Sequence, residues 1–97
     1  MAEVTITHQD RGDSGRYVAE VAGSEHAGHL DWRARGSDVR VATHTLVPPA
    51  IGGRGVAAKL VEAMVADARE HGFRIDPACS YVDVMFRRHT EWAELRA

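Results

Sequence analysis

The sequence predicts an α+β fold, in which four short strands precede a helix, a fifth strand and a second helix. Apolar and polar residues alternate through most of the first half of the chain, whereas apolar residues recur at helical spacing from residue 56 onward. The chain has 97 residues, of which 44% are hydrophobic, which suffices for one core. We therefore expect a single domain over residues 1–97, with a mixed, mostly antiparallel sheet in the order β-β-β-β-α-β-α.

The four strands of the first half are expected near residues 4–8, 17–21, 25–35 and 39–47. The turn sequences QDRGDSG, AGSE and RGSD separate them, and such close turns favour an antiparallel meander. Strict alternation in the fourth strand predicts that one face carries Val39, Val41, Thr43, Thr45 and Val47. The other face would carry Arg40, Ala42, His44 and Leu46.

The second half changes to a helical period. A first helix is expected from Val56 to about Ala68, with polar residues such as Asp67 on its outer face and Gly72 ending it. Residues 73–76 suit a short strand stopped by a proline. The S-x-x-D pattern of residues 80–83 then predicts the start of a second helix, which the tail EWAELRA extends or packs against.

Composition and charge exclude several classes of protein. The formal net charge is −2, which argues against nucleic-acid binding, and no apolar run reaches the roughly 18 residues of a membrane span. The first residues lack the features of a signal peptide, and the single Cys79 fits a reducing cytoplasm. One cysteine and scattered histidines give no zinc-ligand spacing, so no metal site is expected.

The stretch VPPAIGGRGVAAKL, residues 47–60, places three glycines just before the predicted helix. It is typical of an ordinary strand-to-helix turn. It also matches the glycine pattern of a dinucleotide-binding motif. The alternating strand before it and the short chain argue against the doubly wound sheet in which that motif occurs. A third interpretation is a diphosphate site, because free N–H groups at a helix start attract anions and missing side chains let phosphate oxygens approach.

An ordered set of motifs resembles a known family. The stretches HTLVPPAIGGRGVAAKLVEAMVADA, DPACSYV and RRHTEW, with RYVAE and AGHLDWRARG upstream, resemble the small single-domain branch of the GCN5-related N-acetyltransferase superfamily. The resemblance implies a GNAT-like fold, acetyl-CoA as cofactor, and transfer of its acetyl group to a primary amine, either a protein lysine or a small exposed amine.

The resemblance also implies cofactor contacts. The superfamily's phosphate motif falls on residues 52–57, and the backbone of residues 41–47 would pair with the pantetheine arm, with Leu46 and Val47 nearest the acetyl end. Two positions depart from the pattern, because Gly52 replaces a Gln or Arg and Leu46 stands where the branch has Glu. The implied cofactor-binding residues are Leu46, Val47, Gly52, Gly53, Arg54, Gly55, Val56 and Ala57.

Cys79 and His44 are the candidate catalytic residues. Cys79 directly precedes a helix, where the dipole favours the thiolate, but a free cysteine is often only a small buried filler. It would act as a nucleophile that becomes acetylated or, as the resemblance favours, as the acid that protonates the departing coenzyme A. His44 suits a general base, although a strand histidine is often structural.

Two functions remain open from the sequence. The first is an acetyl-CoA-dependent N-acetyltransferase. The second is a non-catalytic module that binds coenzyme A or a protein partner, which the departures at Gly52 and Leu46 keep open. The small sheet has open edge strands, which are compatible with a monomer or a weak homodimer.

Overall fold

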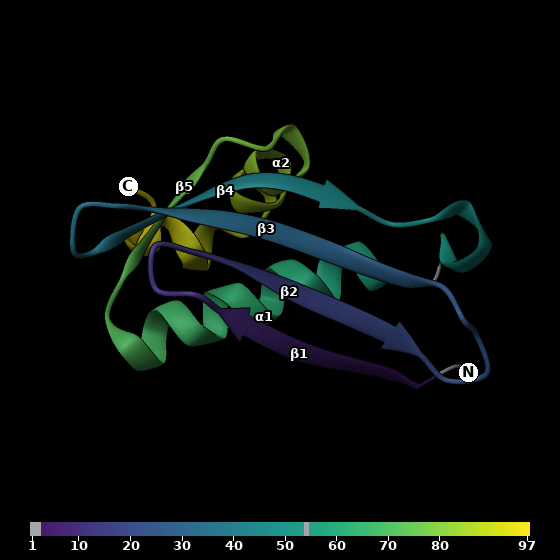
Figure 1. Ribbon diagram of the computed structural model, residues 1–97. Helices are drawn as coiled ribbons and strands as arrows, with labels where there is room; N and C mark the ends of the chain where they lie inside the picture. Colours follow the sequence, from purple (N-terminus) through teal and green to yellow (C-terminus); the bar gives the residue numbers. More distant parts are fainter. Residues whose placement is uncertain (1–2, 54) are drawn as a thin grey trace.

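A computed structural model describes residues 3–53 and 55–97, and within these ranges it contains five strands, two α-helices and two 3-10 helices. Their order confirms the predicted α+β class (Figure 1). The elements are β1 (Val4–Asp10), β2 (Ser14–Val21), β3 (Ala27–Arg35), β4 (Val39–Leu46), η1 (Pro49–Ile51), α1 (Val56–His71), β5 (Arg74–Pro77), α2 (Ser80–Arg88) and η2 (Thr90–Leu95).

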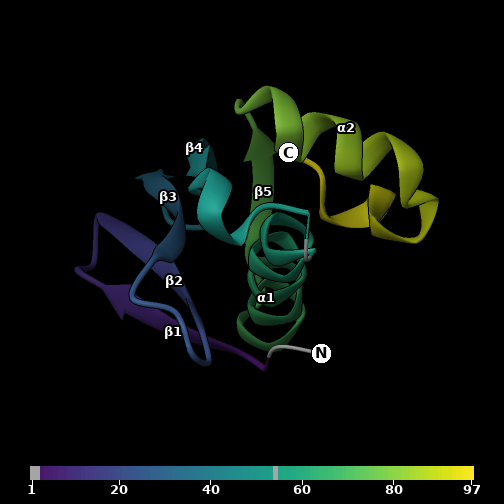
Figure 2. The same ribbon diagram turned by 90° about the vertical axis from the view of Figure 1, so that its right-hand side faces the viewer.

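The strands form one mixed sheet in sequence order, β1-β2-β3-β4-β5. The first four are antiparallel neighbours, and β5 pairs in parallel with β4 after the α1 crossover. Helix α1 packs against β1, β2, β3 and β5, and α2 contacts β4 and β5, so no helix of the described residues covers the opposite face of the sheet (Figure 2). We call this uncovered side the open face.

The hydrophobic core lies between the sheet and α1. Alternate residues of β2 and β3 point into it, whereas the residues between them face the open side. The apolar stripe predicted for α1 is buried as expected, apart from the half-buried Ala57. The buried side chains of these elements are Tyr17, Ala19, Val21, Leu30, Trp32, Val56, Leu60, Val61, Met64, Val65 and Ala68. No helix of the described residues has both the length and the apolar character needed to cross a bilayer.

The prediction of strict alternation along β4 is wrong, because the strand contains a β-bulge. Trp32 of β3 pairs with Ala42, but the preceding Asp31 pairs with His44, so Thr43 is an extra residue. Thr43 and His44 are both exposed, after which Thr45 turns toward the covered side. His44 therefore lies on the open face rather than on the face of the buried Ala42.

Three smaller predictions need correction or completion. The N-cap of α2 is Cys79 rather than Ser80, and Ser80 is the first helical residue, so the S-x-x-D box does not form. Asp67 is half-buried and faces the sheet instead of solvent. The tail forms η2, which buries Trp92 and Leu95, and then returns to β5, where the Ala97 N–H donates to the Ile75 carbonyl at 2.8 Å.

A polar network ties the sheet to α1. The Tyr17 hydroxyl donates to Asp67 Oδ2 at 2.7 Å, and His8 Nδ1 lies 3.4 Å from the same oxygen. The His8 ring stacks on Tyr17 with centroids 4.1 Å apart, and its Nε2 accepts a 2.9 Å hydrogen bond from Trp32 Nε1. That acceptor role requires a deprotonated Nε2, so His8 is neutral in this arrangement. Burial lowers the pKa of His8, although Asp67 and Asp10 oppose the change.

We predict that the free energy of unfolding falls as the pH drops below about 6.5, the ordinary pKa of histidine. The unfolded chain binds this proton more readily than folded His8, so stability present at neutral pH is lost on acidification. His8→Gln should unfold at lower urea concentration at pH near 7.5, and its deficit against the native protein should shrink as the pH falls. A deficit that stays constant with pH would contradict this role of His8.

Candidate functional site

The segment between β4 and α1 is an irregular loop that leaves the start of α1 open. Pro48 precedes η1, which begins at Pro49 and whose buried Ile51 anchors the segment in the core. Gly53 and Gly55 both have left-handed backbone, with φ of 73° and 71°, and a Cβ on either would meet nothing within 4 Å. Both positions therefore need glycine for the backbone turn and face open space. Arg54, which the sequence placed among the phosphate contacts, lies outside the described residues.

The first N–H groups of α1 have no acceptor within the described residues. Between described residues, the first helical hydrogen bond runs from the Lys59 N–H to the Gly55 carbonyl, 3.1 Å long, and no side chain caps the helix. No described acceptor reaches the N–H groups of residues 56–58. N–H groups at the positive end of a helix of 16 residues attract anions, and the bare glycines before them leave them accessible.

Strand β4 carries an unpaired edge beside this helix start. Its pairing with β5 covers only residues 39–42, and the Cys79 N–H then donates to the Ala42 carbonyl at 2.8 Å. Beyond Ala42, no strand of the described chain pairs with this edge, although β3 pairs with the other edge up to Leu46. The backbone of residues 43–47 can therefore accept an extended ligand as an additional strand.

Gly28 brings the end of β4 against α1. A Cβ at this buried position would lie 3.2 Å from the Leu46 carbonyl oxygen and 3.3 Å from both Val47 Cγ2 and Val56 Cγ1. The absent side chain thus lets β3, the end of β4 and the first residue of α1 approach one another. Sequence reasoning missed this role because Gly28 gives no local turn signal, and only the contact between distant segments reveals it.

Cys79 lies where β5 ends and α2 begins, on the covered side of β4. Its thiol donates to the Thr45 hydroxyl at 3.5 Å, a contact that the bulge makes possible by turning Thr45 to this side. Burial raises the pKa of the thiol. The hydroxyl of Thr45 and backbone N–H groups of Val82, Tyr81 and Thr45 outweigh that effect, so the pKa is lower than usual. The thiol of Cys79 is therefore a stronger acid than an ordinary cysteine.

His44 lies on the open face in a row of polar side chains. Asp31 pairs with His44 on one side and with Arg16 on the other, and Arg16 Nε donates to Asp31 Oδ1 at 2.7 Å. The ring of His29 lies 5.9 Å from that of His44, centroid to centroid, and its Nε2 is 3.8 Å from Asp31 Oδ2. Sequence analysis did not group these residues, although alternation against Leu30 and Trp32 already placed His29 and Asp31 on one face.

The structure does not bring His44 and Cys79 together. His44 extends to the open face with His29, whereas Cys79 contacts Thr45 on the covered side. Among the described residues, no hydrogen bond or ion pair joins them. A thiolate–imidazole pair of the kind found in cysteine hydrolases is thus not formed, and the two side chains are available to opposite sides of a ligand on β4.

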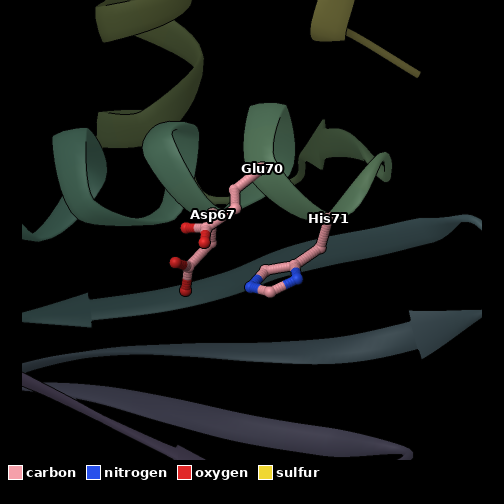
Figure 3. Close-up of side chains that lie close together, drawn as sticks. All are labelled: Asp67, Glu70 and His71. Carbon is pink, nitrogen blue, oxygen red and sulfur yellow. The ribbon is translucent and has the colours of Figure 1, made fainter.

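Two further features lie away from the β4 edge. Ligand atoms of Asp67, Glu70 and His71 lie within 4.8 Å of one another, as i, i+3 and i+4 positions on α1 (Figure 3). This spacing is a sequence signal for a metal site that the sequence analysis overlooked. The contacts of Asp67 with Tyr17 and His8 already account for the position of its carboxylate.

The second feature is a hollow of about 490 Å³ at the β2–β3 end of the sheet, lined by residues that include Glu3, Val18, Glu20 and Glu25.

Comparison with known families supports the resemblance seen in the sequence. A family model described as GCN5-related N-acetyltransferase matches residues 16–95, from within β2 to the end of η2. A comparison with curated proteins returns no match. The matched range contains the α1 start, the unpaired β4 edge, His44 and Cys79. The chain belongs to the GCN5-related N-acetyltransferase family.

Proposed function

We propose that this protein transfers an acetyl group from acetyl-CoA to a primary amine. The observation that carries the proposal is the junction of two open backbone surfaces, the free N–H groups at the start of α1 and the unpaired edge of β4. A diphosphate fits the first, because anions are favoured there, and an amide-containing arm fits the second. Family membership supports acetyl transfer as the reaction class.

The binding contacts follow from this junction. The N–H groups of Val56 and Ala57 would hold the diphosphate, with Gly52, Gly53, Gly55 and Arg54 around it. The pantetheine arm would then run back along β4 from Val47 and Leu46. Because the diphosphate site follows the end of β4, an arm extending away from it carries its thioester toward Thr45 and Cys79. This places the acetyl end further back along β4 than the sequence resemblance implied.

The reaction requires proton transfers on two sides of β4. Acetyl-CoA supplies an activated acetyl group. An ammonium acceptor loses two protons overall; one ends on the coenzyme A sulfur as the C–S bond breaks, and the other goes to solvent. His44 is accessible from the open face and would take a proton as the amine nitrogen forms its bond to the acetyl carbon. Cys79 would deliver a proton to the departing sulfur from the covered side.

This separation favours direct transfer over an acetyl-cysteine intermediate. A nucleophilic cysteine needs a nearby base or a stable thiolate, and His44 does not contact Cys79. Leu46, where the branch usually has Glu, is 48% exposed and supplies no base, so His44 carries that role in the proposal. The open face has no enclosing helix over it, which suits an amine on a protein lysine or another exposed amine.

We propose that the acceptor carries further positive charge in addition to its reacting amine. Val18, which pairs with His29 in the sheet, also lines the hollow that contains Glu3, Glu20 and Glu25. Carboxylates beside an amine-binding surface attract cationic acceptors at low salt. We further propose that the protein works in the reducing cytoplasm, where Cys79 stays a free thiol.

A turnover assay tests the function. The protein is incubated with acetyl-CoA and, separately, with a lysine-containing peptide, a linear polyamine and an uncharged aryl amine, and free coenzyme A is measured by chromatography so that Cys79 does not interfere. Amine-dependent release above the rate without protein supports the proposal. Binding of acetyl-CoA without release for every amine would support the alternative, a non-catalytic coenzyme A-binding module.

We predict that Gly55→Ala weakens coenzyme A binding about tenfold or more, a cost of about 1.4 kcal/mol. An alanine methyl would enter the space beside the free N–H groups and would strain the left-handed backbone. Gly36→Ala is the matched control, because Gly36 also has positive φ, at 68°, and open surroundings, but lies in the β3–β4 turn. Calorimetry that gives equal affinities for the two variants would contradict the diphosphate site.

We predict that Cys79→Ala lowers kcat by about 100-fold, within the range for loss of an acid catalyst. Cys79→Ser should recover little, since a hydroxyl is a much weaker acid than a thiol of lowered pKa. Intact-protein mass spectrometry after exposure to acetyl-CoA without an amine should show no acetyl adduct. Undiminished kcat in Cys79→Ala would remove the acid role, and a stable adduct on Cys79 would contradict direct transfer.

A further inference from the structure

We propose that His29 and His44 act as an interacting pair that relays a proton on the open face of the sheet, with Asp31 as its counter-ion. In this pair His44 meets the acceptor amine, and His29 is a positioning residue that acts through His44. The assignment of the pair to catalysis rests on the proposed acetyl transfer, whereas the coupling itself does not.

The geometry of the open face supports the pairing. The two imidazole rings are 5.9 Å apart between centroids and tilted by 50°, on neighbouring strands. His29 is the more enclosed of the two, since only 19% of its side chain is exposed, and His44 is exposed. An incoming amine therefore reaches His44 first, and His29 lies behind it. The separation is short enough for a single water molecule to bridge ring nitrogens.

Asp31 and Arg16 are charged neighbours of the pair. Asp31 Oδ2 lies 3.8 Å from His29 Nε2, and Arg16 bonds this carboxylate at 2.7 and 3.2 Å. Burial is the main cause that lowers the pKa of His29; the charges of Arg16 and His44 lower it further, and Asp31 opposes them. These groups come from β2, β3 and β4, and no described helix covers this face.

A proton relay between two imidazoles is useful for this reaction. Two positive charges at this spacing repel each other, so protonation of one ring disfavours protonation of the other. A proton that His44 takes as the amine nitrogen bonds to the acetyl carbon can pass to His29, where Asp31 partly offsets the effects of burial and Arg16, and from there to solvent. His44 then returns to its neutral form, which accepts the next proton. No bond other than N–H bonds changes in this transfer.

Imidazole resonances followed by NMR against pH test the coupling in the protein without any ligand. His44→Gln should raise the apparent pKa of His29 by about half a pH unit, the effect of one charge at about 6 Å in water. Asp31→Asn should lower the pKa of His29. His26→Gln, in the β2–β3 turn, is the control and should leave the His29 titration in place. An unchanged His29 titration in His44→Gln would overturn the pair.

The kinetic consequence separates this proposal from the proposed function. In His29→Gln, the acidic limb of the kcat/KM profile should move up in pH, because a positive charge beside the base is lost. A purely structural role would lower kcat/KM equally at every pH, and that result would overturn the positioning role. Coupled titrations in a protein that shows no turnover with any amine would contradict the acetyl transfer while leaving the coupling established.

Discussion

The extra residue at Thr43 is the constraint on which the site depends. Before the bulge, β4 pairs with both β3 and β5; after it, β4 keeps only β3. A bulge bends its strand and increases the local twist, so β4 leaves β5 at this point and exposes one backbone edge. The same bulge leaves His44 on the open face and turns Thr45 toward Cys79. One added residue therefore creates both the unpaired edge of β4 and the placement of His44 and Cys79 on two sides of it.

The start of α1 is held against this edge by packing rather than by a cap. Ile51 anchors the loop in the core, and Gly28 allows the end of β4 and Val56 to approach closely. Because the helix is positioned by its buried stripe, its first N–H groups can remain without internal partners. A capping side chain would stabilise the helix by about 1 kcal/mol but would occupy those N–H groups. The absence of a cap among the described residues is thus consistent with an anion site.

Most of the fold could be predicted from the sequence because local periodicity and turn residues determine it. The meander, the α1 stripe and the left-handed Gly72 all follow from spacing alone. The bulge could not be predicted, since Thr43 and His44 are ordinary strand residues and only the pairing with Trp32 and Asp31 reveals the irregularity. The same reason hid the contact between Cys79 and Thr45 and the row of Arg16, Asp31, His29 and His44, because each joins residues from different elements.

The most direct measurement is amide NMR during a titration with coenzyme A. If the helix start holds the diphosphate and the unpaired edge of β4 holds the pantetheine, the amide signals of residues 55–58 and of Thr45 and Val47 will shift together, at one affinity. Signals of β1, which is distant from this edge in the sheet order, will stay in place. Shifts confined to the hollow lined by Glu3, Glu20 and Glu25 would contradict the placement of the cofactor. The absence of any shift at residues 55–58 with millimolar coenzyme A would contradict it as well.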